Sequence, residues 1–319
     1  MTDLRQDSPP LGKGVTLGLG AYGLWGLLPL YFVLLLPASP VEIVANRVLW
    51  SLLFCMLLLS VTRSWGALLA ALHSPRTLAA LSLAALLIVG NWLTYTYGVT
   101  SGQATEAALG YFINPLISVL LGVLILKERL RPLQWVALGI GFVAVIQLTV
   151  AYGRLPWIAL VLALTFGFYG FTKNRLGSRT TAITSLSVET AVLAPIAAVL
   201  MLLLAQSGTA TLTSQGTAHF WWMASSGLVT AIPLLLFGAA ARRLPLVSIG
   251  LLQYFSPVLQ FLVAVLILKE QMGLERWIGF GIVWLALIVL TVDLLASMRR
   301  NRVLRRAEQM PQQAEQTEP

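Results

Sequence analysis

The stretch PLISVLLGVLILKERL, residues 115–130, is closely matched by PVLQFLVAVLILKEQM, residues 257–272. Both begin with a proline and carry the identical string VLILKE, 142 positions apart. The match at this offset continues beyond the strings, because Trp135 aligns with Trp277 and Gly139 with Gly281. The sequence therefore predicts an internal duplication, in preference to chance similarity among Leu- and Val-rich segments.

The composition places both copies in a membrane. Of the 319 residues, 58% are hydrophobic and 10% are charged, which is too little charge to cover a soluble surface. A helix of about 20 apolar residues crosses a bilayer, and runs of about that length recur along the chain. We predict an all-α integral membrane fold with spans at 15–36, 41–61, 77–97, 104–126, 132–150, 155–171, 182–205, 218–241, 245–268 and 273–297. The longest connecting loops are 62–76 and 206–217.

The duplication divides these ten predicted helices into two copies of five. We expect an N-terminal segment at 1–13, a first repeat at 14–150, a second at 151–297, and a tail at 298–319 that begins basic and ends as a disordered Gln/Glu-rich segment. Because five is odd, the second copy enters the membrane from the opposite side. Inverted repeats of this kind are a recurrent architecture of secondary transporters, with the substrate near the bilayer midplane.

The distribution of Lys and Arg sets the orientation. With both termini in the cytoplasm, 17 of the 21 basic residues fall inside, and only Arg154, Lys269 and Arg276 fall outside, with Arg47 within a span. The net charge of +9 is therefore interpreted as a topology signal and as a means of contacting anionic lipid, and we expect no nucleic-acid partner.

The sequence lacks the residues that several kinds of functional site require. Cys55 is the only cysteine, which excludes an internal disulfide, and His73 and His219 lie near loop ends. The string GLGAYG at 18–23 fits G-x-G-x-x-G, but it lies within an apolar helix, where glycines favour close helix packing. We expect no cofactor, no metal, no catalytic residue and no enzymatic activity.

Several strings also carry a family resemblance. They are AYGLWGLLPLYF, NRVLWS, ALGYFINPLISVLLG, FGFYGFTKNRL and LLQYFSPVLQFLVAV. Together they resemble the drug/metabolite transporter superfamily with paired EamA domains. The resemblance covers nearly all of the membrane part and leaves out the tail. It implies a ten-helix permease of the bacterial inner membrane, and it implies little about the substrate.

Two charged residues fall inside predicted spans. Arg47 and Glu189 are separated by the repeat offset of 142, so they occupy equivalent positions in helices of opposite direction. We predict that Arg47 binds an anionic substrate group or pairs with Glu189, and that Glu189 is an ion-coupling site for protons. The alternatives are that Arg47 extends to the headgroups and that Glu189 forms a purely structural ion pair.

Aromatic and amide side chains mark a candidate cavity for an amphipathic molecule. The predicted substrate-binding residues are Arg47, Asn91, Trp92, Tyr95, Tyr111, Asn114, Tyr169, Gln253 and Tyr254. An interfacial aromatic belt is the alternative for the rings of the third span. Pro115 and Pro257 are hinge candidates because each removes a helix hydrogen bond; inherited geometry without motion is the alternative.

We therefore predict a secondary transporter that moves a small amphipathic metabolite or drug-like molecule across the bacterial inner membrane by alternating access, with proton coupling. The sequence contains no G-x-x-x-x-G-K-[ST] motif for ATP-driven transport. The alternative is a channel or facilitator for small polar solutes without ion coupling. The expected partners are membrane lipid and the substrate, and the expected state is a monomer or weak homodimer.

Overall fold

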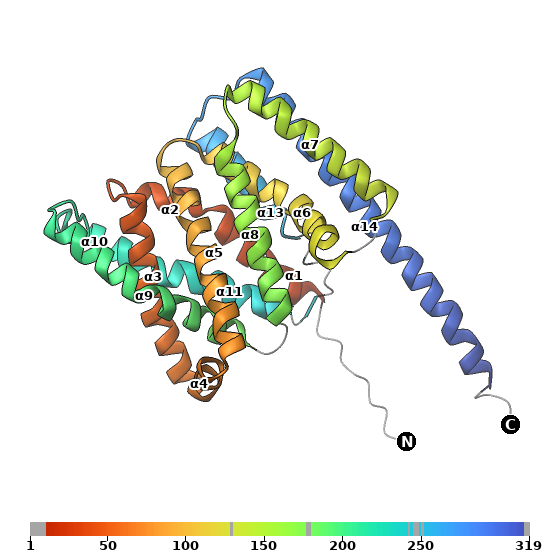
Figure 1. Cartoon of the computed structure of the whole chain (residues 1–319), viewed down its shortest axis with the longest axis horizontal. Helices are drawn as coiled ribbons and strands as arrows, with labels where there is room; N and C mark the ends of the chain where they lie inside the picture. Colours follow the sequence, from red (N-terminus) through yellow and green to blue (C-terminus); the bar gives the residue numbers. More distant parts are fainter. Residues whose placement is uncertain are drawn as a thin grey trace. The chain divides into compact units, whose positions relative to one another are not determined.

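The computed structural model describes residues 11–127, 130–176, 180–241, 243–244, 249 and 252–315, and the regular elements in these ranges are helices (Figure 1). The chain forms two compact units. Unit 1 comprises residues 1–118 and 156–272, and unit 2 comprises residues 119–155 and 273–319. Each unit therefore takes segments from both predicted repeats.

Unit 1 holds most of the helices. They are α1 (Leu11–Gly26), α2 (Leu28–Leu34), α3 (Pro40–Val61), α4 (Trp65–His73), α5 (Pro75–Thr100), most of α6 (Ala104–Leu126), α8 (Trp157–Leu176), α9 (Ala182–Gln206), α10 (Gly216–Ala224), α11 (Ser226–Ala241), α13 (Phe255–Leu262) and the π-helix η2 (Val263–Ile267). Unit 2 contains the end of α6 together with α7 (Pro132–Tyr152) and α14 (Leu274–Glu315), which run side by side (Figure 1).

Side-chain caps explain where three long helices begin. A hydroxyl oxygen before the first turn accepts a hydrogen bond from an otherwise unpaired amide. The caps are Ser39 for α3, Ser74 for α5 and Thr181 for α9, which accept from the amides of Glu42, Thr77 and Thr184 at 3.2, 3.4 and 3.2 Å. Prolines at the first position of α3 and α5 fix the backbone for helix entry. These starts lie within two residues of the predicted ones.

Seven helices of the described chain are long and apolar enough to cross a membrane, or eight if the bent pair α1–α2 forms one span. The multi-pass membrane prediction is therefore confirmed, whereas the count of ten stays a prediction. The first predicted span bends by 40° between α1 and α2. In the ninth, the described apolar helix covers Phe255–Ile267, and positions 245–248 and 250–251 lie outside the described residues. The sixth corresponds to α8, which is not among the seven.

The connecting segments differ from the sequence prediction in two places. The predicted loop 62–76 contains α4. The tail, predicted to be disordered, continues α14 as a helix as far as Glu315. Its Arg, Ala, Gln and Glu residues have high helix propensity, which favours continuation of the helix.

The matched prolines occupy different local settings. Pro115 lies inside the continuous helix α6, where it removes one backbone hydrogen bond. Pro257 is the third residue of α13, in a first turn whose amides have no partner within the helix. Pro257 therefore marks a helix start and does not kink a continuous span. The hinge role of both residues stays a prediction.

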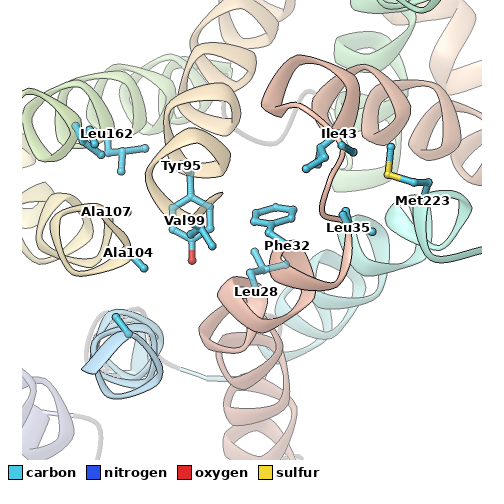
Figure 2. Close-up of a cluster of buried hydrophobic side chains, with 13 residues drawn as sticks. Leu28, Phe32, Leu35, Ile43, Tyr95, Val99, Ala104, Ala107, Leu162 and Met223 are labelled. Carbon is cyan, nitrogen blue, oxygen red and sulfur yellow. The ribbon is translucent and has the colours of Figure 1, made fainter. Parts of the chain in front are cut away.

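Helix pairing within unit 1 brings the two halves of the sequence together. Helix α3 packs on α9, α5 on α8, and α1 on α11. A core between these helices gathers Leu28, Phe32, Ile43, Tyr95 and Met223 (Figure 2). In a soluble protein, burial of such side chains contributes about 25 cal/mol per Å² of apolar surface removed from water. Between helices in a membrane, close van der Waals packing stabilises the contact instead.

Helix α11 packs tightly against α3 at Gly227. A Cβ atom at this position would lie 2.4 Å from the backbone oxygen of Trp50 and 3.1 Å from the amide nitrogen of Ser51. Only glycine allows two helix backbones to approach this closely. One turn along each helix, this contact positions Thr230 against Arg47.

Three carboxylates of unit 1 accept hydrogen bonds from backbone amides in the opposite half of the sequence. Glu42 accepts from Thr211 and Leu212 at 2.7 and 2.9 Å, Glu106 from Ile158 at 3.0 Å, and Glu270 from Ala104 and from Thr105 at 2.9 Å. Charged acceptors of this kind satisfy amides at helix starts and in loops, where no helical partner exists. We name these three carboxylates the cross-half caps.

The twin VLILKE strings each end their helical run in the same way. Lys127 and Lys269 both have a φ of 55°, in the left-handed region that commonly terminates helices. In the second copy, the following residue is the cap Glu270; its counterpart Glu128 lies outside the described residues. The repeated string thus specifies a helix end and the turn after it.

Candidate functional site

A buried arginine forms the first polar centre of unit 1. Arg47 extends from α3 with 5% of its surface exposed. Its Nε donates a hydrogen bond to Thr230 Oγ1 on α11 at 2.8 Å. Its guanidinium carbon lies 4.0 Å from the ring centre of Trp92 on α5 and 5.9 Å from that of Phe32. One edge and one face of the guanidinium are therefore fixed by the protein.

The remaining donors of Arg47 are not used. In the described part of the chain, its two terminal nitrogens make no hydrogen bond and no carboxylate pairs with it. A buried charge without a counter-charge is costly, so this arrangement favours an anion as the missing partner. Hydroxyl-bearing rings follow Phe32 in the same cluster, since Tyr95 lies 5.8 Å from Phe32 and Tyr111 lies 5.5 Å from Tyr95, between ring centroids. The Tyr95 hydroxyl is buried and has no hydrogen-bond partner among the residues that the structure describes.

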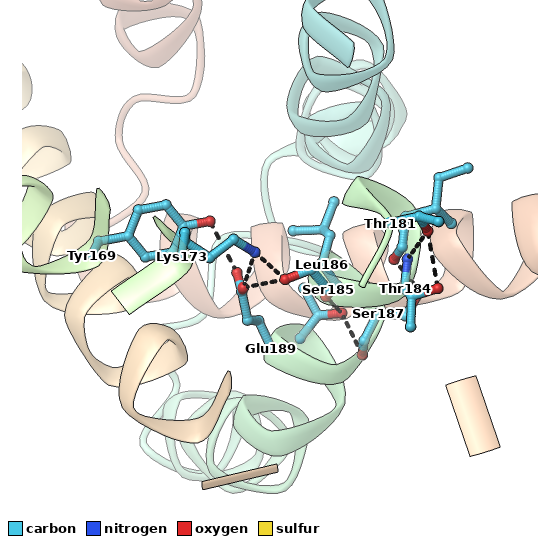
Figure 3. Close-up of polar contacts among 10 residues, drawn as sticks. Tyr169, Lys173, Thr181, Thr184, Ser185, Leu186, Ser187 and Glu189 are labelled. Carbon is cyan, nitrogen blue, oxygen red and sulfur yellow. Dashed lines mark hydrogen bonds and ion pairs between the residues drawn. The ribbon is translucent and has the colours of Figure 1, made fainter. Parts of the chain in front are cut away.

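A carboxylate forms the second polar centre, between α8 and α9 (Figure 3). Glu189 is 1% exposed. Its Oε1 accepts from Lys173 Nζ at 2.7 Å and from Ser185 Oγ at 2.9 Å, and its Oε2 accepts from Tyr169 Oη at 3.2 Å. Lys173 also donates to Ser185 Oγ. The Glu189 carboxylate is therefore fully engaged with protein donors.

The two predicted charges thus have different partners. Lys173, with 28% of its side chain exposed, forms the ion pair with Glu189. No hydrogen bond or ion pair joins Arg47 to Glu189 among the described residues. Of the three options that the sequence left open for Arg47, the pair with Glu189 is absent among the described residues, whereas anion binding stays a prediction and extension to the headgroups stays its alternative.

A row of aromatic rings connects the two centres. Neighbouring ring centroids lie 5.8, 5.5, 5.7 and 6.0 Å apart along Phe32, Tyr95, Tyr111, Phe166 and Tyr169. The row begins beside Arg47 and ends at the tyrosine that donates to Glu189. Its edge-on and tilted contacts are those that aromatic pairs prefer. An apolar wall with a cation near one end and a carboxylate at the other suits an amphipathic ligand.

Asn91 holds one side of this wall in place. Its Nδ2 donates to Leu162 O and Thr165 Oγ1, both at 3.1 Å, and its Oδ1 accepts from Tyr111 Oη at 2.9 Å. These bonds tie α5, α6 and α8 together. Asn91 and the Tyr111 hydroxyl, predicted as substrate contacts, are therefore engaged with protein groups in this structure.

The other predicted residues take no part in these bonds. The Asn114 Oδ1 atom on α6 is buried and has no hydrogen-bond partner among described residues. Gln253 and Tyr254 are half-buried in the turn before α13. Among the described residues, no group of three His, Cys, Asp or Glu side chains is arranged to hold a metal.

Sequence reasoning did not identify the partners of the two charges. Lys173 lies just beyond the predicted sixth span, 155–171. Its place one helical turn after Tyr169, facing α9, could have suggested the ion pair. Thr230 and Ser185 are single hydroxyls in apolar helices, and no feature of the sequence distinguishes them from the others.

Known proteins resemble this chain over most of its length. The EamA-like transporter family matches residues 12–150. Protein RarD of Streptomyces exfoliatus is 49% identical over 289 residues, which cover 91% of each chain. An uncharacterized transporter of Pseudomonas aeruginosa is 44% identical, covering 91% of this chain and 97% of that one. A solved crystal structure at 18% identity superposes with a TM-score of 0.58, over 88% of this chain and 97% of the other, and it shares the fold.

Proposed function

Because the chain belongs to the EamA-like transporter family, in which its relatives are named RarD, we propose that it is a secondary transporter for a small amphipathic molecule. It would act by alternating access in the bacterial inner membrane. The observation that carries this proposal is the buried Arg47, held by Thr230 and Trp92, with unused donors beside a row of aromatic rings. A cation kept without a counter-charge inside a membrane protein is typical of a substrate site.

The packing of unit 1 supports the inverted repeat that alternating access uses. A shift of 142 residues exchanges the α5–α8 pair with the α11–α1 pair, and it exchanges α3 with its own partner α9. This exchange of helix pairs is the one expected if a twofold axis relates two copies of five helices. We therefore retain ten spans, the repeats at 14–150 and 151–297, and cytoplasmic termini as parts of the proposal. Lipid and substrate are its partners, in a monomer or weak homodimer.

Proton coupling is assigned to the Lys173–Glu189 pair. A proton on Glu189 removes the negative charge that holds the Lys173 ammonium, so the contact between α8 and α9 weakens when a proton binds. Because Tyr169 donates to the same carboxylate and ends the aromatic row, protonation also changes the far end of the candidate substrate wall. These contacts support the proposed link between proton binding and the candidate substrate site.

Reconstitution tests this function. A thermal-shift screen of purified protein against amino acids, organic acids and amphenicols identifies ligands, since a bound ligand stabilises the fold. Proteoliposomes should then show saturable uptake of a radiolabelled hit, driven by a pH gradient. Glu189→Gln should transport without pH dependence, whereas the control Glu275→Gln, at an exposed carboxylate, should behave as wild type.

Two results would contradict the proposal in different ways. Binding without flux above empty liposomes would exclude transport of that ligand. A single-channel conductance in planar bilayers would favour the alternative of a channel or facilitator. If transport by Glu189→Gln keeps the pH dependence of the wild type, only the proton-coupling role of Glu189 is refuted.

A further inference from the structure

The charges around Arg47 specify the class of substrate. We infer that this site binds a monocarboxylate with a planar apolar body and no ammonium group. The inference rests on the proposed transport function and adds the chemistry of the cargo.

The positive side of the site consists of one guanidinium. Arg47 is the only Lys or Arg below one-tenth exposure among the residues whose side chains the structure describes. Its free edge presents two terminal nitrogens, which match the two oxygens of a carboxylate in a bidentate pair. One cation balances one negative charge, so a phosphate dianion would leave a net charge in a poorly hydrated site.

Among the described residues, the carboxylates of unit 1 are already engaged with other protein groups. Unit 1 has four described acidic residues. Three of them are the cross-half caps, which hold backbone amides. The fourth, Glu189, is paired with Lys173. An amino-acid substrate would therefore bring an ammonium that finds no free carboxylate among the described residues, at the cost of an unpaired buried charge.

The aromatic rings beside the guanidinium indicate that the ligand has a planar apolar body. Phe32 and Tyr95 lie side by side in the core of unit 1, with ring centroids 5.8 Å apart (Figure 2). Tyr111 follows at 5.5 Å from Tyr95. Flat rings offer stacking and edge contacts to a planar ligand. The Tyr95 hydroxyl, which has no partner in the described part of the chain, is a further donor within the same group of rings for a ligand oxygen.

A series of ligands that share one phenyl ring and differ in charge tests the inference directly. We call the preference for one carboxylate and no ammonium group the charge rule. Isothermal calorimetry on the purified full-length protein at pH 7.4 would compare phenylacetate, phenylacetamide, phenylalanine, phenethylamine and phenyl phosphate. We expect phenylacetate to bind, and the other four to bind at least about tenfold more weakly, because each leaves a charge or a donor unpaired.

Variants assign the binding to Arg47. Arg47→Gln should lose phenylacetate affinity by about tenfold or more, and Arg47→Lys should retain part of it as a point charge without the bidentate fork. Arg76→Gln, at an exposed arginine in the first turn of α5, should bind as wild type. Because Arg47→Gln removes a buried charge, Arg47→Lys provides the folded comparison if the glutamine variant is unstable.

The outcomes separate this inference from the proposed function. It is overturned if phenylacetate fails to bind at millimolar concentration, if the amide or the amino acid binds as tightly, or if Arg47→Lys binds as wild type. If phenylacetate binds but proteoliposomes do not transport it or any other ligand, the transport proposal fails and the charge rule stands. If a neutral ligand is bound and transported instead, transport stands and the charge rule fails.

Discussion

The contact between α3 and α11 predicts a large effect from one added methyl group. In Gly227→Ala, the new Cβ would lie 2.4 Å from Trp50 O and 2.6 Å from Trp50 C, which are backbone atoms that cannot rotate away. Carbon contacts below 3.0 Å are essentially never observed, and ordinary contacts begin near 3.4 Å. The two helices must therefore separate by about 0.6 to 1.0 Å.

That separation acts on the candidate site one turn away. If it is transmitted in full to the bond between Arg47 Nε and Thr230 Oγ1, now 2.8 Å, the distance becomes about 3.4 to 3.8 Å, at or beyond the limit for a hydrogen bond. We expect a loss of about 1 to 3 kcal/mol in unfolding free energy from overpacking. We also expect weaker phenylacetate binding, because the guanidinium loses the bond that orients it.

The single cysteine provides the assay. Cys55 is fully buried, so a fluorogenic maleimide reacts with it only as the protein unfolds on heating in detergent. Gly227→Ala should lower the unfolding midpoint by several degrees. Gly238→Ala is the matched control, because it lies on the same helix with no heavy atom within 4 Å of the added Cβ. It should be neutral or slightly stabilising. Equal midpoints for the two variants would refute the close approach of α3 and α11.

Three further substitutions test the polar contacts. Glu42→Ala removes the acceptor of three hydrogen bonds, and we expect a loss of about 2 to 4 kcal/mol because two backbone amides are left unpaired. Tyr111→Phe removes one neutral bond to Asn91, which is worth about 1 kcal/mol. Lys173→Met leaves the Glu189 carboxylate without its counter-charge, which costs about 3 kcal/mol, the lower end for a buried pair because the lysine is partly exposed. Adding Glu189→Gln to Lys173→Met should recover much of that loss.

The same Cys55 assay measures these variants. Glu275→Ala, which removes an exposed carboxylate of α14, is the control for a simple change of charge. A Glu42→Ala midpoint equal to that of Glu275→Ala would contradict the capping role. A double variant no more stable than Lys173→Met would contradict the ion pair. A loss in Tyr111→Phe as large as that in Glu42→Ala would show that the hydroxyl has a further partner.

The sequence predicted the features that depend on local chemistry. Membrane helices follow from apolar length, and the starts of α3, α5 and α9 follow from a hydroxyl or proline at the first turn. Arg47 and Glu189 were identified because charge within an apolar run is unusual. Both are buried, as expected for residues inside spans.

The partners of those residues could not be predicted, because they depend on which helix faces approach each other. Thr230 contacts Arg47 only because Gly227 allows α11 to lie against α3. Lys173 reaches Glu189 because α8 ends beside the start of α9. The bend between α1 and α2 and the short α13 also lie within apolar runs whose hydropathy is continuous. The period of the apolar residues indicates which face of a helix is buried, but it does not indicate which helix packs against that face.

The cross-half caps have a consequence for the biogenesis of the protein. Glu42 and Glu106 leave the ribosome well before Ile158, Thr211 and Leu212, the residues whose amides they hold in the finished fold. During that interval each carboxylate stays hydrated at the membrane surface, because a charge is expensive to bury without its donors. The early helices therefore wait in an unlocked state until translation of the second half supplies the missing amides. We therefore expect these contacts to form only after the second half of the chain has been synthesised.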